Sequence, residues 1–473
     1  MNYISFSFLF FVIISVIIYY LVPSKRRGIV LLIASLIFYI SFDLKYLIFL
    51  LFVALSTFIT ARFLSINKNK KLLFVLCIIL NVIVWFVVKM QPFTNLSNTI
   101  FILVPVGISY YILQSIGYLV DVYKGKIKAE KSFWKYLLFL SYFPAIVQGP
   151  ISRYTELMPQ LLNENKLKFN EFRDSLILIL FGLVKKIVIA DRLGIFVNSC
   201  FDNVSNLSGV ILYIGAVFYS IQLYNDFSGC VDICRGVSKL FCINLNHNFN
   251  RPYLSESIKD FWSRWHMSLS SWLKDYIYIP LGGSREGKII KYINIMITFI
   301  ISGIWHGAGF NFLYWGILHA IYQIFGDLTL NLRNKFKKLI GIELGSKSDK
   351  IYKVIITFNL VTFAWIFFRA DSFIIAIEYI NNMFSNASLW TLFDKSLFSY
   401  GISQNYFNIL LIHVFISLLI ELYFSKQEKV VNEIVNFHLI IRWIIYLILI
   451  FDILLFGVYG SGYSLSSFMY GGF

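Results

Sequence analysis

Apolar runs long enough to cross a bilayer recur along this chain and restrict what it can fold into. Of its 473 residues, 58% are hydrophobic and only 14% are charged, whereas a soluble domain carries about 25% charged residues. About 17 to 25 apolar residues span the hydrocarbon core as a helix, where every backbone polar group needs an internal partner. The sequence therefore predicts an all-α polytopic membrane protein with roughly eleven transmembrane helices plus re-entrant and interfacial helices.

Basic residues lie mainly between the apolar runs, which is typical of cytoplasmic loops. The first five runs cover residues 4–22, 29–41, 46–61, 72–89 and 99–121. Basic segments follow the first, third and fifth runs, so we expect those segments in the cytoplasm. The net charge of +17 then reflects topology and not nucleic-acid binding. A basic cytoplasmic face would also attract an anionic nucleotide thioester or an acidic carrier protein.

Two of the later runs depart from a simple span. The run over residues 136–149 is short for a full span and includes Pro144. Both features favour a re-entrant or broken helix. Residues 174–198 carry Lys185 and Lys186 near the middle, and such charges should face protein or water. The remaining runs cover residues 208–225, 292–304, 310–326, 354–368, 406–424 and 438–459. We expect the lysine-rich loop 327–353 in the cytoplasm and short amphipathic elements outside the membrane in 369–405.

The stretch "SGIWHGAGF", residues 302–310, places His306 inside a very apolar region. An ionisable side chain at membrane depth is costly and points to function, although a core histidine bonded to a carbonyl also fits. The apolar run before it, 292–304, is short for a bilayer crossing. We therefore expect the turn that carries His306 to lie within the thickness of the membrane.

A second histidine lies in "FWSRWHMSLSSWLKDYIYIPLGGSR", residues 261–285. The stretch is too polar to span, and its tryptophans and tyrosines suit an interfacial segment. His266 in this stretch is either a packing residue or a functional one.

The stretch "QLYNDFSGCVDICRG", residues 222–236, brings Asp226 and Asp232 to the end of a run. These carboxylates either face the interface, orient a histidine, or pair with Lys185 or Lys186.

Motifs of soluble enzymes are missing from the sequence. It has no P-loop, GxSxG, HExxH or strand-linked GxGxxG motif, and its five cysteines show no zinc-type spacing, so we expect no metal or prosthetic group. Without a serine nucleophile, the attacking hydroxyl should belong to the substrate. His306 then fits a general base in acyl transfer to an alcohol.

The two histidine stretches together resemble the membrane-bound O-acyltransferase (MBOAT) family, in particular its bacterial alginate and peptidoglycan O-acetyltransferase branch. Further matching stretches are "VPVGISYYILQSIGYLVDVYKG", "YFPAIVQGPISRY", "LFGLVKKIVIADRL" and "FAWIFFRADS". The resemblance implies a helical bundle around a central funnel or tunnel. It implies His306 and His266 as catalytic residues. We place Trp305, Arg264, Lys274, Asp226 and Asp275 in the binding of the donor.

The resemblance also implies the reaction and its participants. A cytoplasmic thioester, with acetyl-CoA as the expected donor, would supply an acetyl group for an extracytoplasmic polysaccharide, either peptidoglycan or an exopolysaccharide. An esterase-like partner, anchored in the membrane or secreted, would complete the transfer. We expect a multi-pass protein of the bacterial cytoplasmic membrane, surrounded by membrane lipids, with one domain over 1–473. Within it we distinguish N-terminal helices (1–122), a catalytic core (123–370) and a C-terminal part (371–473).

Alternatives remain open from the sequence alone. The related branch that transfers D-alanyl groups to teichoic acids is the close alternative. A transporter for a lipid-linked glycan or a structural scaffold would have a similar composition. The sequence ends in "FMYGGF", and a role for Tyr470 as an acyl relay is a hypothesis, because the aromatic residue that commonly follows in the family is missing.

Overall fold

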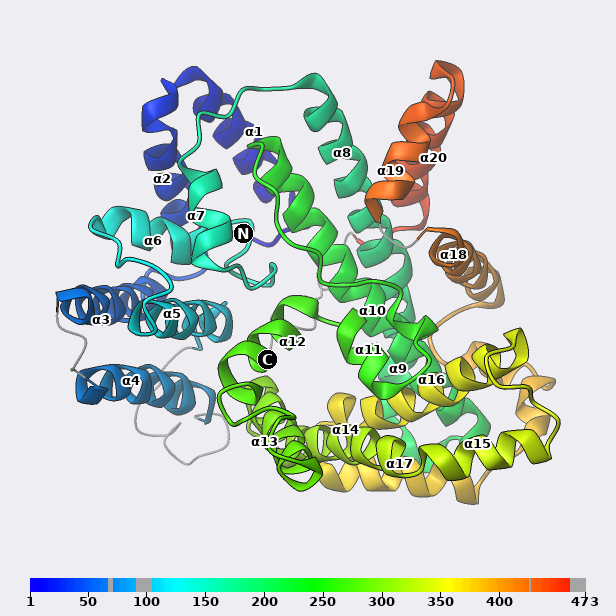
Figure 1. Cartoon of the computed structure of the whole chain (residues 1–473). Helices are drawn as coiled ribbons and strands as arrows, with labels where there is room; N and C mark the ends of the chain where they lie inside the picture. The colour runs from blue at the N-terminus through cyan, green and yellow to red at the C-terminus, as the bar shows by residue number, and fades with distance from the viewer. Residues whose placement is uncertain (67–70, 91–103, 425–426, 460–473) are drawn as a thin grey trace. The chain divides into compact units, whose positions relative to one another are not determined.

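The computed structural model describes residues 1–66, 71–90, 104–424 and 427–459, and their regular structure is helical, with no strand among them (Figure 1). A helix pairs its own backbone donors and acceptors, as a chain this apolar requires in a bilayer. The predicted all-α fold is thus confirmed for this part of the chain.

The α-helices follow one another along the chain as α1 (Phe6–Leu21), α2 (Arg27–Ile40), α3 (Tyr46–Ile66), α4 (Lys71–Met90), α5 (Ile108–Tyr123), α6 (Phe133–Ser141), α7 (Tyr154–Leu161), α8 (Phe169–Leu183), α9 (Asp191–Asp202), α10 (Gly209–Leu240), α11 (Ile258–Arg264), α12 (Met267–Leu273), α13 (Lys288–His306), α14 (Phe310–Leu328), α15 (Leu330–Leu339), α16 (Lys347–Arg369), α17 (Phe373–Ser385), α18 (Gln404–Tyr423), α19 (Gln427–Asn436) and α20 (Leu439–Phe456). Two π-helical segments, Val184–Ala190 and Lys274–Tyr278, continue α8 and α12.

Six of the described helices are long and apolar enough to cross a membrane, namely α3, α4, α13, α16, α18 and α20. The multi-pass character predicted from the sequence is therefore confirmed, and the count of roughly eleven spans stays a prediction. The broken helix predicted over 136–149 is also seen, because α6 ends at Ser141 and turns follow it. The segment 369–405 forms α17 and two short 3-10 turns, as expected of short elements.

The prediction of a short limb before His306 is wrong. The helix α13 has 19 residues and is about 28 Å long at 1.5 Å per residue. It begins at Lys288, after Gly287 with φ +96°, so the polar first turn extends the apolar run. It ends at His306, where the extended Gly307 stops the helix. The depth of His306 in the membrane stays a prediction.

The chain forms two compact units. The first comprises residues 1–183 and 229–247 among those described, with α1 to α8 and the end of α10. Its core is aromatic: Phe38 and Phe143 lie 5.9 Å apart between ring centroids, and Phe143 and Phe241 also lie 5.9 Å apart. The Tyr3 hydroxyl donates to the Phe143 carbonyl at 2.9 Å.

The second unit comprises residues 184–228 and 248–459 among those described, and it contains both candidate histidines. Its centre is the hairpin of α13 and α14, in which glycines allow a close crossing of the two helices. A Cβ atom on Gly303 would lie 2.5 Å from the Phe312 carbonyl oxygen, and one on Gly316 would clash with the Phe299 carbonyl. The Asn311 side chain donates to the Ala370 carbonyl at 2.8 Å and joins the start of α14 to the end of α16.

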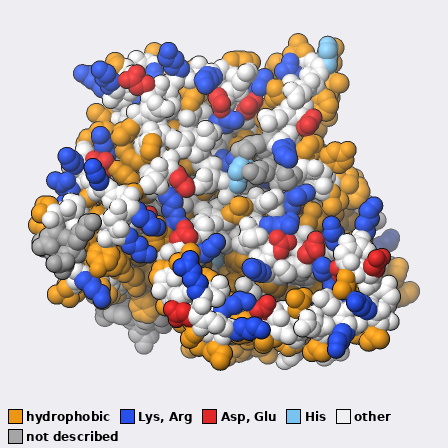
Figure 2. Space-filling model, viewed as in Figure 1, with side chains coloured by type: hydrophobic (Ala, Val, Ile, Leu, Met, Phe, Trp, Pro, Cys, Tyr) orange, Lys and Arg blue, Asp and Glu red, His pale blue; other side chains and the backbone are white. Residues whose placement is uncertain are grey.

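The lysine-rich segment 327–353 contains the helix α15, which the sequence did not predict. The helix exposes Leu332, Phe336 and Leu339 on its surface, and Figure 2 shows hydrophobic side chains exposed beside Lys and Arg in this region. Its Lys337 forms a buried ion pair of 2.8 Å with Asp349 of α16. An exposed apolar stripe with flanking cations suits a helix that lies on a membrane surface.

The close crossing of α13 and α14 predicts that one methyl group added at the crossing lowers the stability of the protein. Gly303→Ala should lower the free energy of unfolding by about 1–3 kcal/mol, because overpacking outweighs the better helix propensity of alanine. Gly326→Ala on α14 is the matched control, since its Cβ would meet only the Arg333 side chain at 3.8 Å. Thermal unfolding of the full chain in detergent measures both. Equal midpoints for the two variants would contradict the close crossing.

Candidate active site

His306 is the last residue of α13, and only 2% of its surface is exposed. Three aromatic rings enclose the imidazole edge to face. Its centroid lies 4.7 Å from that of Trp305, 5.0 Å from that of Trp315 on α14 and 5.2 Å from that of Phe368 on α16. Edge-to-face contacts of this kind fix a ring in place. Three helices of the second unit thus hold the imidazole in one orientation.

His266 lies immediately before α12 and is fully buried. Its backbone is left-handed, with φ +42° and ψ +55°, a conformation that costs a non-glycine residue about 1–3 kcal/mol and occurs at functional sites. Asn248 holds this turn through two hydrogen bonds to the residues that follow His266. Its carbonyl accepts from the Met267 N–H at 3.0 Å, and its side-chain oxygen accepts from the Ser268 N–H at 3.1 Å.

Burial controls the charge of His266. It lowers the pKa of this imidazole from its ordinary value of 6.5 to about 3, because an apolar environment disfavours the imidazolium. The ring is therefore neutral near pH 7, with one nitrogen able to donate a hydrogen bond and the other able to accept one.

Trp305 links the two histidines. Its indole lies next to both imidazoles, with centroids 4.7 Å from His306 and 6.2 Å from His266. Phe227 of α10 contacts the other side of His266 at 4.8 Å. The structure thus brings together three of the predicted site residues, His266, Trp305 and His306, from stretches about forty residues apart in the sequence.

The charged residues predicted for donor binding have different environments. Arg264 donates through Nε to Asp260 at 2.8 Å, and this pair is partly exposed. Lys274 is exposed at the start of the second π-helical segment, and Asp275 is half-buried beside it. All three belong to the short helical stretch that carries His266. Their contact with a donor stays a prediction.

Asp226 lies in a buried cluster with two other charged residues. Lys186, on the first π-helical segment, donates to Asp226 at 2.5 Å and pairs with Asp191 at 2.9 Å. The sequence-based alternative in which Asp226 pairs with Lys186 is confirmed, while Asp191 was missed. The next residue on α10, Phe227, packs on His266, so this ion pair lies close to the candidate site along the chain. A role of Asp226 in donor binding stays a prediction.

Sequence reasoning did not find the hydrogen bond between Trp262 and His319. Trp262 on α11 donates from Nε1 to Nδ1 of His319 on α14 at 3.2 Å, and the contact is buried. The signal available in the sequence is the spacing of Trp315 and His319, four residues apart, which places both on one face of a helix.

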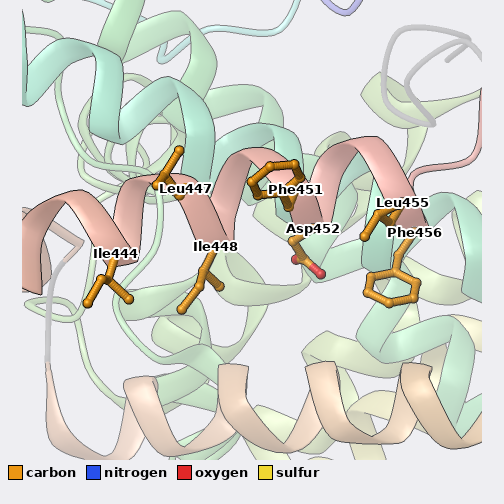
Figure 3. Close-up of a pocket in the computed structure, with 7 residues that line it drawn as sticks. All are labelled: Ile444, Leu447, Ile448, Phe451, Asp452, Leu455 and Phe456. Atoms are coloured by element: carbon orange, nitrogen blue, oxygen red, sulfur yellow. The ribbon is translucent and has the colours of Figure 1, made fainter.

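A separate apolar groove lies along α20 and does not include the candidate residues. Figure 3 shows its lining, and its volume is about 360 Å³. All its lining residues come from α20: Ile444, Leu447, Ile448, Phe451, Asp452, Leu455 and Phe456. The only charged one, Asp452, pairs with His413 of α18 at 2.7 Å. An apolar groove on such a helix suits a lipid chain better than polar reactants.

Among the described residues, no group of three or more His, Cys, Asp or Glu side chains is placed to hold a metal ion. Tyr470 lies outside the described residues, so its relay role stays a hypothesis.

This chain is similar to known proteins over most of its length. The model of the MBOAT, membrane-bound O-acyltransferase family, matches residues 33–376. The peptidoglycan O-acetyltransferase of Helicobacter pylori is 36% identical over 395 residues, covering 75% of this chain and 73% of that protein. The probable alginate O-acetylase AlgI of Pseudomonas fluorescens is 32% identical over 375 residues, covering 78% of this chain and 72% of that protein. The teichoic acid D-alanyltransferase of Bacillus subtilis is 27% identical over 399 residues, covering 78% of this chain and 98% of that protein.

The chain belongs to the membrane-bound O-acyltransferase family, and the resemblance inferred from its two histidine stretches is confirmed. It is an acyltransferase with several membrane-spanning helices.

The buried cluster around Lys186 predicts an asymmetry between two substitutions. Lys186→Met leaves two carboxylates buried without their cation and should cost about 3–5 kcal/mol of unfolding free energy. Asp226→Asn leaves the pair of Lys186 with Asp191 in place, so its cost should be smaller. Thermal unfolding of the full chain in detergent compares the two. A larger loss for Asp226→Asn would show that the cluster does not act as an ion pair.

The environment of His266 predicts a dependence of stability on pH. Between pH 6.5 and 3 the unfolded chain binds a proton at His266 that the folded chain does not bind, so folding weakens as the pH falls below 6.5. From pH 7.5 to 5.5 the loss is about 1 kcal/mol. His266→Asn removes this titration and tolerates the left-handed backbone. Unfolding midpoints are measured for wild type and His266→Asn at pH 7.5 and pH 5.5. The midpoint of wild type should fall further than that of the variant, and equal decreases in the two proteins would refute the prediction.

Proposed function

We propose that this protein transfers an acetyl group from a cytoplasmic thioester donor, across the bacterial cytoplasmic membrane, for the O-acetylation of an extracytoplasmic polysaccharide. One observation carries the proposal: His306 and His266, the two histidines of the motif stretches, are both buried, and each ring lies next to Trp305. The two acetyl-transferring relatives, 36% and 32% identical, support acetyl transfer over D-alanyl transfer, for which the relative is 27% identical.

In the proposed reaction His306 acts as the general base. It takes the proton of the attacking hydroxyl, whose oxygen forms an ester bond with the thioester carbonyl carbon. The carbon–sulfur bond breaks, and the leaving thiolate receives the proton back from the imidazolium. The position of His306 at the C-terminal end of α13 favours this cycle, because the negative end of the helix dipole stabilises a positive charge there.

His266 has a different task in this proposal. A neutral imidazole can donate a hydrogen bond to the thioester carbonyl oxygen, where negative charge develops during the attack. Asn248 binds the backbone of the two residues that follow His266, and Phe227 and Trp305 contact its ring, so the imidazole is held in advance. A ring held in advance needs no reorganisation when the charge appears.

The proposed donor and the proposed partner rest on the chemistry of the reaction and on the family to which the chain belongs. Acetyl-CoA is the expected donor, and its phosphates would be attracted to exposed cations such as Lys274 near the site. We include the esterase-like partner, membrane-anchored or secreted, because the acceptor polymer lies outside the membrane. Peptidoglycan and a secreted exopolysaccharide are both acceptors that present suitable hydroxyl groups.

Replacing His306 tests the proposed function. His306→Ala should lower ester-linked acetyl groups by at least about 100-fold, the range for loss of a general base. The measurement quantifies acetyl and D-alanyl esters on purified cell wall and on secreted polysaccharide, from cells with equal amounts of each protein. His438→Ala, at an exposed histidine before α20, is the control.

The pattern of loss identifies the reaction. Loss of acetyl esters from one fraction supports the proposal and names the acceptor. Loss of D-alanyl esters alone would replace it with the teichoic acid alternative. Unchanged esters of both kinds would overturn the role of His306 and favour the transporter alternative.

A further inference from the structure

A third buried histidine lies close to the proposed catalytic pair. His319 on α14 is fully buried. Aromatic rings surround it, including Trp315 at 5.1 Å, Trp262 at 5.1 Å and Trp365 at 6.0 Å between centroids. The mechanism above does not use this residue.

The hydrogen bond from Trp262 determines which nitrogen of His319 carries the proton. An indole N–H can only donate, so Nδ1 of His319 accepts at 3.2 Å and the proton of the neutral ring is on Nε2. This Nε2 is buried and has no hydrogen-bond partner among the described residues. One nitrogen of the ring is thus satisfied and the other is not.

Stability alone does not account for an imidazole at this position. A buried donor without an acceptor costs about 1–3 kcal/mol, whereas the bond that Nδ1 accepts contributes only about 0.5–1.5 kcal/mol. Phenylalanine would fill a similar volume in this aromatic environment without an unsatisfied N–H. The benefit of the imidazole therefore lies in the geometry that the Trp262 bond imposes.

The bond joins the two halves of the active site. Trp262 lies four residues before His266, on the short helix that leads to it, and its ring lies 5.6 Å from that of Trp315. Trp315 in turn packs against His306 at 5.0 Å. One hydrogen bond thus connects the segment that leads to His266 with α14, whose Trp315 contacts His306.

We propose that His319 is a positioning residue: by accepting the hydrogen bond of Trp262 at Nδ1, it fixes α11 against α14 and so sets the distance between His266 and His306. The proposal rests on the proposed function, because it assigns His319 to the geometry of that reaction. It predicts that the rate of transfer depends on His319, while binding of the donor does not.

Three substitutions of His319 separate its two nitrogens. The amide oxygen of His319→Asn occupies nearly the place of Nδ1 and can accept from Trp262, whereas the amide of His319→Gln reaches the place of Nε2. His319→Phe keeps the ring and removes both nitrogens. We expect His319→Asn to keep acetyl transfer within about threefold of wild type, and His319→Phe and His319→Gln to lose about tenfold or more, as misplacement of reacting groups by an ångström does.

Two measurements on the full-length protein give the readout. The first is the rate at which labelled acetyl esters appear on cell wall and secreted polysaccharide in cells with equal amounts of membrane-inserted protein. The second is the affinity of the purified protein in lipid nanodiscs for acetyl-CoA, which should change less than twofold. Equal rates for His319→Asn and His319→Phe would overturn the proposal, and so would a loss that follows only the affinity for acetyl-CoA.

A double variant checks that the effect passes through Trp262. If the bond is the cause, Trp262→Phe together with His319→Phe should be no slower than the slower single variant, because both remove one interaction. Multiplicative losses would contradict it. His306→Ala in the same assay separates the two proposals. Unchanged acetyl transfer in His306→Ala would overturn the proposed function. Loss of transfer in His306→Ala together with full activity of His319→Phe would overturn only the role of His319.

Discussion

The rest of the site depends on the burial of three imidazole rings among aromatic side chains. His266, His306 and His319 are at most 2% exposed, and each contacts at least one tryptophan. Water is excluded from such surroundings, so a hydrogen bond made there is strong and a missing one is costly. Close packing also means that a ring moves only if its neighbours move. The cluster therefore acts as a rigid support in which the position of one histidine constrains the others.

Helix geometry explains why this support forms at the end of α13. Gly303 and Gly316 let α13 and α14 approach closely, which places Trp315 against His306. Asn311 joins α14 to the end of α16, whose Phe368 closes the ring of contacts. His266 comes from a short segment and needs separate support. Asn248 provides it on one side, and Phe227, next to the buried pair of Asp226 and Lys186, provides it on the other.

The sequence predicted the features that follow from composition and local spacing. It indicated a multi-pass membrane protein and a broken helix within 136–149, and it offered the pair of Asp226 with Lys186 as one of several alternatives, because charges in apolar runs must pair. It missed the full length of α13, whose first turn is polar yet helical. It also missed Asp191, because the π-helical segment changes which residues face one another. Trp262 and His319 are 57 residues apart, and no local pattern reveals a bond across that separation.

The two histidines proposed as catalytic share one aromatic cluster, and the surroundings of each ring fit the task proposed for it. Burial keeps His266 neutral, with a pKa of about 3, so it suits a hydrogen bond to a carbonyl oxygen and not the repeated uptake of a proton. His306 lies at the C-terminal end of a 19-residue helix, where the dipole stabilises the imidazolium that forms during the attack. Exchanging these tasks would place the positive charge on His266, whose burial lowers the pKa of the imidazole and so opposes that charge. In the proposed reaction, the proton of the attacking hydroxyl therefore goes to His306 and not to His266.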